Sequence, residues 1–95
     1  MAVFRANTRS IASENTFTDA MDCKSGSLAL SISGTWSGVI TVQRSFDAGV
    51  VWVDADSFEF NIETTIEDPV EDVLYRVGIK TGDYTDGTAE VGLYK

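Results

Sequence analysis

The sequence contains no histidine, one cysteine and one proline among its 95 residues. The absence of histidine removes the commonest metal ligand and the side chain best suited to general base catalysis near neutral pH. Since a cysteine nucleophile needs an activating partner, we expect Cys23 to be a bystander thiol. One cysteine also cannot form an intrachain disulfide, so stability is expected to come from packing or from partner subunits.

Basic residues are scarce, with 7 Lys and Arg against 15 Asp and Glu and a formal net charge of −8. The resulting negative potential repels phosphate backbones, so we expect no nucleic-acid partner. The first ten residues lack the apolar core of a signal peptide, and no stretch approaches the ~18 to 20 apolar residues of a membrane span. We therefore expect synthesis in a cytoplasm and no membrane partner.

The chain is long enough for one compact core but not for a second domain or a deep enzyme cleft. At this length folding buries roughly 60 to 70 % of the surface of the unfolded chain. A hydrophobic content of 43 %, including two tryptophans, is typical of a folded protein.

Apolar residues alternate with polar ones along most of the chain, and this period of two predicts six strands from residue 26 onward. Residues 34–38 are expected to break the first strand, residues 67–72 to form a solvated acidic loop, and residues 82–87 to form a turn. The apolar members of the predicted strands are Leu28, Leu30 and Ile32; Ile40, Val42 and Phe46; Val51, Trp52 and Val53; Phe58, Phe60 and Ile62; Val73, Tyr75, Val77 and Ile79; and Ala89, Val91 and Leu93.

Short strands with frequent turns and no convincing helix predict an all-β fold, an antiparallel β-sandwich of the immunoglobulin or fibronectin type III kind, with a small β-barrel as the alternative. We expect residues 10–95 to form this single domain. Residues 1–9 are expected to form a flexible or partner-bound N-terminal arm, with Phe4, Arg5 and Arg9 as candidate contacts. Residues 15–21 fit a strand, a short helix or part of an arm.

The segment Ser45–Trp52 has the spacing S-x-D-x-G-x-x-W. This spacing resembles the Asp-box hairpin of sialidase propeller blades and of several unrelated β-proteins. Asp47 supplies a local hydrogen-bond acceptor and Gly49 tolerates positive φ, as a tight turn requires. We therefore expect Ser45, Asp47, Gly49 and Trp52 to form a structural turn between two strands, with Trp52 in the core over it. Asp47 is expected to cap backbone amides and not to act as a catalytic acid.

Residues 34–52 read GTWSGVITVQRSFDAGVVW, and Leu74-Tyr75-Arg76 and Thr85-Asp86-Gly87-Thr88 follow later. This combination resembles small β-sandwich proteins encoded among the structural genes of tailed bacteriophages, in which G-T-W-x-G-x-x-x-x-Q-R-S-x-D-x-G-x-x-W precedes a tyrosine-arginine strand and a T-x-G-T hairpin. The resemblance covers residues 26–94. The chain departs from the pattern at Ala48, where a second glycine is common.

The resemblance implies a non-enzymatic virion protein, either a capsid decoration protein or a head-tail or tail accessory subunit. Its partners would be viral capsid or tail proteins, and a homo-oligomer is expected. The short length and acidic composition of the chain agree with this hypothesis, because a compact acidic module without a cleft suits assembly better than catalysis. We expect no cofactor.

Two other functions are alternatives to a virion role. A carbohydrate-binding module, for example for host-surface glycans, would use Trp36 and Tyr84, which are also the candidate contacts for a protein partner. We expect Trp36 to be a core residue at a strand bend, whereas Tyr84 is expected at a loop tip. A small hydrolase would need a carboxylate pair, and nothing in the sequence selects one.

Two acidic groups could supply oxygen ligands for calcium. They are Asp54 with Asp56, and the group Glu67, Asp68, Glu71 and Asp72. Neither has the spacing of an EF-hand, so we expect solvated charge and no metal site.

Overall fold

The computed structural model describes residues 5–23, 26–70 and 72–95. These residues form nine strands and no helix, and every strand pairing is antiparallel. The strands are β1 (Ala6–Ile11), β2 (Thr16–Phe17), β3 (Met21–Asp22), β4 (Ser27–Gly38), β5 (Ile40–Ser45), β6 (Val53–Phe58), β7 (Ile62–Glu67), β8 (Leu74–Ile79) and β9 (Tyr84–Tyr94).

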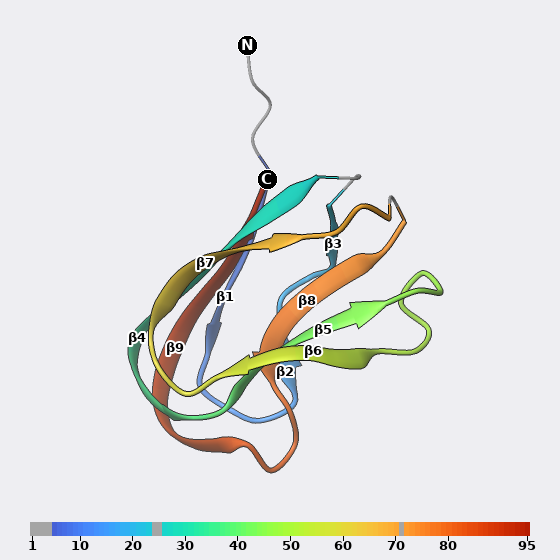
Figure 1. Cartoon of the computed structure of the whole chain (residues 1–95). Coiled ribbons are helices and arrows are strands. Elements are labelled where there is room, and N and C mark those ends of the chain that lie inside the picture. The colour runs from blue at the N-terminus through green and yellow to red at the C-terminus, as the bar shows by residue number, and fades with distance from the viewer. Residues whose placement is uncertain (1–4, 24–25, 71) are drawn as a thin grey trace.

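The strands form two sheets (Figure 1). The first, sheet A, has the order β1-β9-β4-β7, and the second, sheet B, has the order β2-β8-β5-β6 with β3 also paired to β8. The predicted all-β, antiparallel class is therefore confirmed, and the two sheets are compatible with a β-sandwich. Strand β7 lies at one edge of sheet A, and strand β6 lies at one edge of sheet B.

The core lies between the sheets and takes alternate residues from each long strand. The alternation predicted for residues 28–32, 73–79 and 89–93 is confirmed, because every apolar member of these runs is at most 3 % exposed. Burial of these side chains is the main stabilising contribution to a domain of this size. The core residues are Ile11, Met21, Cys23, Leu28, Leu30, Ile32, Ile40, Val42, Val73, Tyr75, Val77, Ile79, Ala89, Val91 and Leu93.

The predicted break at residues 34–38 is wrong. Strand β4 continues through Gly38 and stays paired with β9, with a register shift only between Ser37 and Gly38. Gly34 has φ 97°, and a Cβ there would lie 2.6 Å from the carbonyl oxygen of Thr88 on β9. Glycine at this position therefore allows close approach of two paired backbones and does not end the strand.

Two further expectations about strand ends are corrected. The run Phe58, Phe60 and Ile62 does not form one strand, because β6 ends at Phe58 in sheet B and β7 begins at Ile62 in sheet A. Phe60 lies in the connection and is 60 % exposed. Phe46 follows the end of β5, where strand alternation no longer applies, and is 63 % exposed.

The N-terminal segment also differs from the expected arm. Ala6–Ile11 form β1, which pairs with β9 along its whole length, and the backbones of Arg5 and Lys95 exchange two hydrogen bonds of 2.9 Å. Most of residues 5–9 thus belongs to sheet A. Phe4, with residues 1–3, lies outside the described residues.

Substitution of two glycines with similar backbone conformation tests the close approach of β4 and β9. Gly34→Ala should lower the free energy of unfolding by about 3 kcal/mol, because the new methyl group adds a clash with Thr88 to the strain of positive φ. Gly82 has φ 91° but no heavy atom within 4 Å of an added Cβ. Gly82→Ala should therefore cost only about 1 kcal/mol. Equal losses for the two variants in urea denaturation would contradict the close approach.

Candidate functional site

The most distinctive site is the β5–β6 hairpin, where side chains close the turn. The Ser45 hydroxyl donates to Asp47 Oδ1 at 2.8 Å and accepts from the Gly49 N–H at 2.8 Å. Asp47 Oδ1 also accepts from the Val51 N–H at 2.9 Å. These hydrogen bonds satisfy turn amides that have no backbone partner, so the predicted structural role of Ser45, Asp47 and Gly49 agrees with the geometry.

The charge of Asp47 is part of this turn. Hydrogen bonds from the Val51 N–H and the Ser45 hydroxyl favour the carboxylate form and hold the pKa of Asp47 below its ordinary value. Ala48 and Gly49 both have positive φ, at 60° and 88°. Ala48 therefore occupies the left-handed conformation that favours glycine, and the surrounding hydrogen bonds hold it there.

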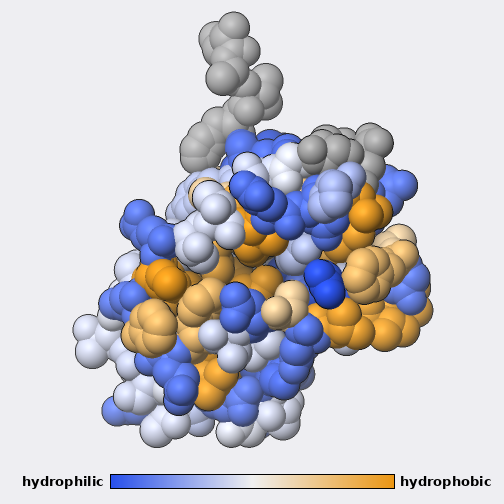
Figure 2. Space-filling view, viewed as in Figure 1, coloured by the Kyte–Doolittle hydropathy of each residue, from blue (hydrophilic) through white to orange (hydrophobic). Residues whose placement is uncertain are grey.

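Large apolar side chains at the end of this hairpin point into solvent. Their exposed fractions are 63 % for Phe46, 80 % for Val50, 55 % for Val51 and 41 % for Val53. We call these four residues the hairpin tip. Figure 2 shows hydrophobic surface at the right of the view, where Figure 1 draws the β5–β6 hairpin. Concentration of such side chains on a small acidic protein indicates an interaction site.

An open hollow adjoins the hairpin tip and carries acidic side chains. Its lining residues are Asp22, Phe46, Asp47, Ala48, Asp72 and Leu74. Three of these six residues are aspartates, one each from β3, the β5–β6 turn and the loop before β8. The apolar tip is therefore bordered on this side by negative charge.

Behind the tip, an arginine is sandwiched between two aromatic rings on the outer face of sheet B. The guanidinium carbon of Arg76 lies 4.1 Å from the centre of the Phe17 ring and 4.4 Å from that of Trp52. Burial lowers the pKa of Arg76 from its ordinary value. Trp52 is thus half-buried on the outer face, not in the core, which corrects the prediction. It does pack over the turn, because a Cβ at Gly49 would lie 3.6 Å from its ring.

The stack continues into a chain of polar contacts across three strands. Arg76 Nε donates to Gln43 Oε1 at 3.0 Å, and Gln43 Nε2 donates to Asp54 Oδ1 at 3.0 Å. Lys80 Nζ donates to Asp54 Oδ2 at 2.7 Å. The bonds from Lys80 and Gln43 lower the pKa of Asp54 from its ordinary value. We call Phe17, Gln43, Trp52, Asp54, Arg76 and Lys80 the outer-face network.

Three polar residues of β5 are buried, and the outer-face network accounts for one of them, Gln43. Thr41, Gln43 and Ser45 are 2 %, 7 % and 0 % exposed, although their alternation with the core residues predicts a solvent-facing side. Arg76 and Gln43 lie opposite each other in the β5–β8 register. The alternation of β8 predicts that Arg76 faces away from the core. It does not predict that β5 is the neighbouring strand or that Phe17 of β2 stacks on Arg76.

The acidic loop after β7 is less solvated than predicted. Asp68 is 7 % exposed and accepts from the Tyr75 hydroxyl at 2.7 Å and from the Val70 N–H at 2.8 Å. These two bonds lower the pKa of Asp68, whereas burial and the neighbouring carboxylate raise the pKa of Tyr75. Asp68 therefore fixes the loop against β8.

Other predicted contact residues have structural partners. Trp36 Nε1 donates to Asn61 Oδ1 at 2.7 Å, and Tyr84, which begins β9 and is not at a loop tip, donates its hydroxyl to the Gly87 carbonyl at 2.8 Å. Both aromatic rings are partly buried against the core. Arg9 donates to the Phe17 carbonyl at 3.2 Å.

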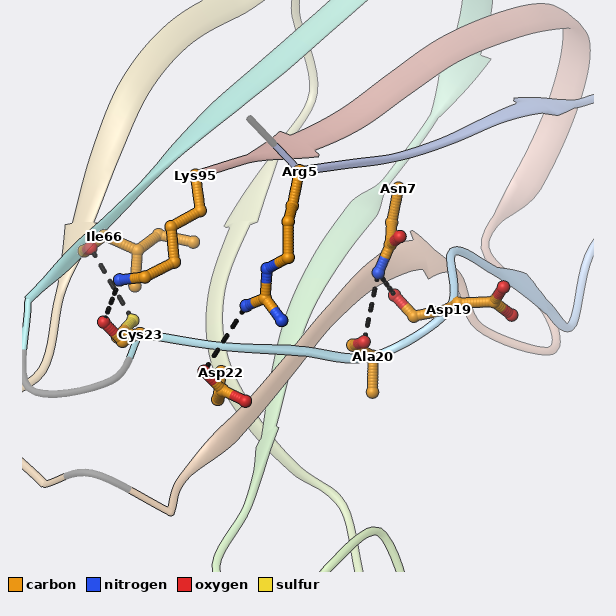
Figure 3. Close-up of polar contacts among 8 residues, drawn as sticks. All are labelled: Arg5, Asn7, Asp19, Ala20, Asp22, Cys23, Ile66 and Lys95. Atoms are coloured by element: carbon orange, nitrogen blue, oxygen red, sulfur yellow. Dashed lines mark hydrogen bonds and ion pairs between the residues drawn. The ribbon is translucent and has the colours of Figure 1, made fainter. Parts of the chain in front are cut away.

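Side chains from the two chain ends also reach the β2–β3 segment (Figure 3). Arg5 pairs with Asp22 at 3.4 Å, Asn7 donates to the carbonyls of Asp19 and Ala20, and Lys95 donates to that of Cys23. The Cys23 thiol is buried, and this burial raises its pKa. Such a thiol is a poor nucleophile.

Within the described ranges, no group of three or more His, Cys, Asp or Glu residues is arranged to hold a metal ion. Likewise, no helix in this part of the chain could cross a membrane. Comparison with protein-family models, with curated proteins and with solved structures finds no match to this chain.

The Arg76 stack can be tested with a conservative substitution. Arg76→Lys keeps the charge but loses the planar stacking and the bond to Gln43, so we expect a loss of about 1 to 2 kcal/mol in unfolding free energy. Arg9→Lys, at an exposed arginine with one hydrogen bond, is the control and should change stability by no more than about 0.5 kcal/mol. Chemical denaturation measures both, and indistinguishable effects would contradict a special role for Arg76.

Proposed function

We propose that the protein is a non-enzymatic virion subunit of a tailed bacteriophage that acts by binding other virion proteins. Capsid decoration or stabilisation is the favoured role, ahead of a head-tail or tail accessory role. The sandwich would be of the immunoglobulin or fibronectin type III kind, and the resemblance of residues 34–52 to phage structural proteins supports this assignment.

The observation that carries the proposal is the group of exposed apolar side chains at the hairpin tip. Four large apolar residues between positions 46 and 53 are at least 41 % exposed. Exposed apolar surface of this kind gains free energy when another protein covers it. Assembly is therefore a better explanation of this surface than catalysis, for which the hairpin offers no activated nucleophile or base.

The edge strands give assembly a second possible contact. Among the described strands, β6 and β7 each pair on one side only, and each lies at the edge of its sheet. Unpaired backbone groups at a sheet edge can accept a further strand from a partner. Asp54 and Asp56 place charge on β6, which disfavours pairing with another acidic edge.

The binding function can be tested with purified particles. The full chain should co-sediment saturably with either the capsids or the tails of the phage whose genome encodes it, and the particle that binds identifies the location. Light scattering on the protein alone gives its oligomeric state. A protein that binds neither particle at micromolar concentration would contradict the proposal. The test uses the full chain, because a variant without residues 2–9 would lack most of β1 and could fail to bind simply by unfolding.

A further inference from the structure

We propose that the hairpin tip is the docking element of this protein and that it inserts into an apolar recess, bordered by lysine or arginine, on a different virion protein. This inference rests on the proposed function and names the surface and the chemistry of its partner. The contact residues would be Phe46, Val50, Val51 and Val53.

The tip is held in one conformation before any partner binds. Its side chains are attached to a turn that is fixed by the Ser45 and Asp47 hydrogen bonds of 2.8 to 2.9 Å. On one side Trp52 anchors the turn against Arg76, and on the other the Arg44 guanidinium lies 5.2 Å from the centre of the Phe46 ring. A preformed element loses little conformational entropy on binding, so more of its apolar contact appears as affinity.

The tip also differs from the other exposed apolar residues because it groups several of them together. Phe60 and Val70 are 60 % and 54 % exposed, but each is a single large apolar residue in a connection between strands. Only the hairpin presents four such side chains within eight consecutive positions of the described chain. Scattered apolar residues are ordinary on protein surfaces, whereas a contiguous group marks a binding site.

Charge decides between a second copy and a different protein as the occupant. Asp47 and Asp72 line the hollow beside Phe46 together with Asp22, which is paired with Arg5, and the whole chain carries a formal net charge of −8. Two tips brought together would place these carboxylates near one another, which costs free energy. A recess with a basic border would instead be attracted to the same carboxylates. An anionic lipid surface is disfavoured for the same reason as a second copy.

The decisive experiment measures co-sedimentation of three proteins with the capsids or tails that bind the wild type. The double variant Val50→Ser/Val51→Ser removes exposed apolar surface without adding charge, and we expect its affinity to fall at least tenfold. The control Phe60→Ser/Val70→Ser removes similar side chains elsewhere and should bind within twofold of wild type. Circular dichroism and thermal melting verify that all three proteins are folded.

Each outcome of this experiment has one meaning. If the wild type binds neither particle, the proposed function fails. If it binds and the double variant at the tip binds equally well, the function stands and the docking inference is overturned. A photo-reactive benzoylphenylalanine in place of Val50 should crosslink to a different particle protein, and a crosslink to another copy of this chain would overturn the inference.

Salt and lipid vesicles distinguish the remaining occupants. Binding to a basic border should weaken as salt is raised from 50 to 500 mM, whereas self-association of two tips should strengthen because salt screens the repulsion between the carboxylates beside them. Asp72→Asn should reduce that salt dependence. Vesicles of phosphatidylcholine and phosphatidylglycerol should not bind the protein, and vesicle binding that Val50→Ser/Val51→Ser abolishes would overturn a protein occupant.

Discussion

The Ser45 hydroxyl and the Asp47 carboxylate take the place of backbone partners that the β5–β6 turn lacks, and both surfaces of the hairpin depend on them. The turn places Trp52 over Gly49, where its ring can stack on Arg76. Arg76 in turn holds Gln43, which contacts Asp54 across the hairpin. The same turn projects Phe46, Val50 and Val51 away from the sheets. Two side chains thus fix a partly buried polar network on one side and an exposed apolar tip on the other.

The regular parts of the fold could be predicted because their alternation is local. Leu28 to Ile32 and Val73 to Ile79 each place apolar residues on one face, and both lie in strands of the core. The glycine at position 34 led to the wrong prediction of a strand end, because Gly34 permits close approach of β4 to β9 inside a long strand. Pairing of β1 with β9 could not be predicted, since Ala6–Ile11 are mostly polar and their partner is some 80 positions away.

The candidate site was predicted only in part for the same reason. Ser45, Asp47 and Gly49 act within their own turn, so their spacing reveals their contacts. Arg76 and Phe17 depend on which strands neighbour β8, and this information is not local to either segment. The alternation that correctly placed Val77 in the core also placed Phe46 there, because a pattern does not reveal the residue at which a strand stops.

The central claim is that the hairpin tip is preformed in the free protein, and amide hydrogen exchange followed by NMR tests it most directly. The Gly49 and Val51 N–H groups donate to Ser45 Oγ and Asp47 Oδ1, so both should exchange much more slowly than in an unstructured peptide. The Ser45→Ala variant should lose this protection at Gly49 while the amides of β8 keep theirs. Exchange of both amides at unstructured rates in the folded wild type would show that the tip forms only on binding and would contradict the account.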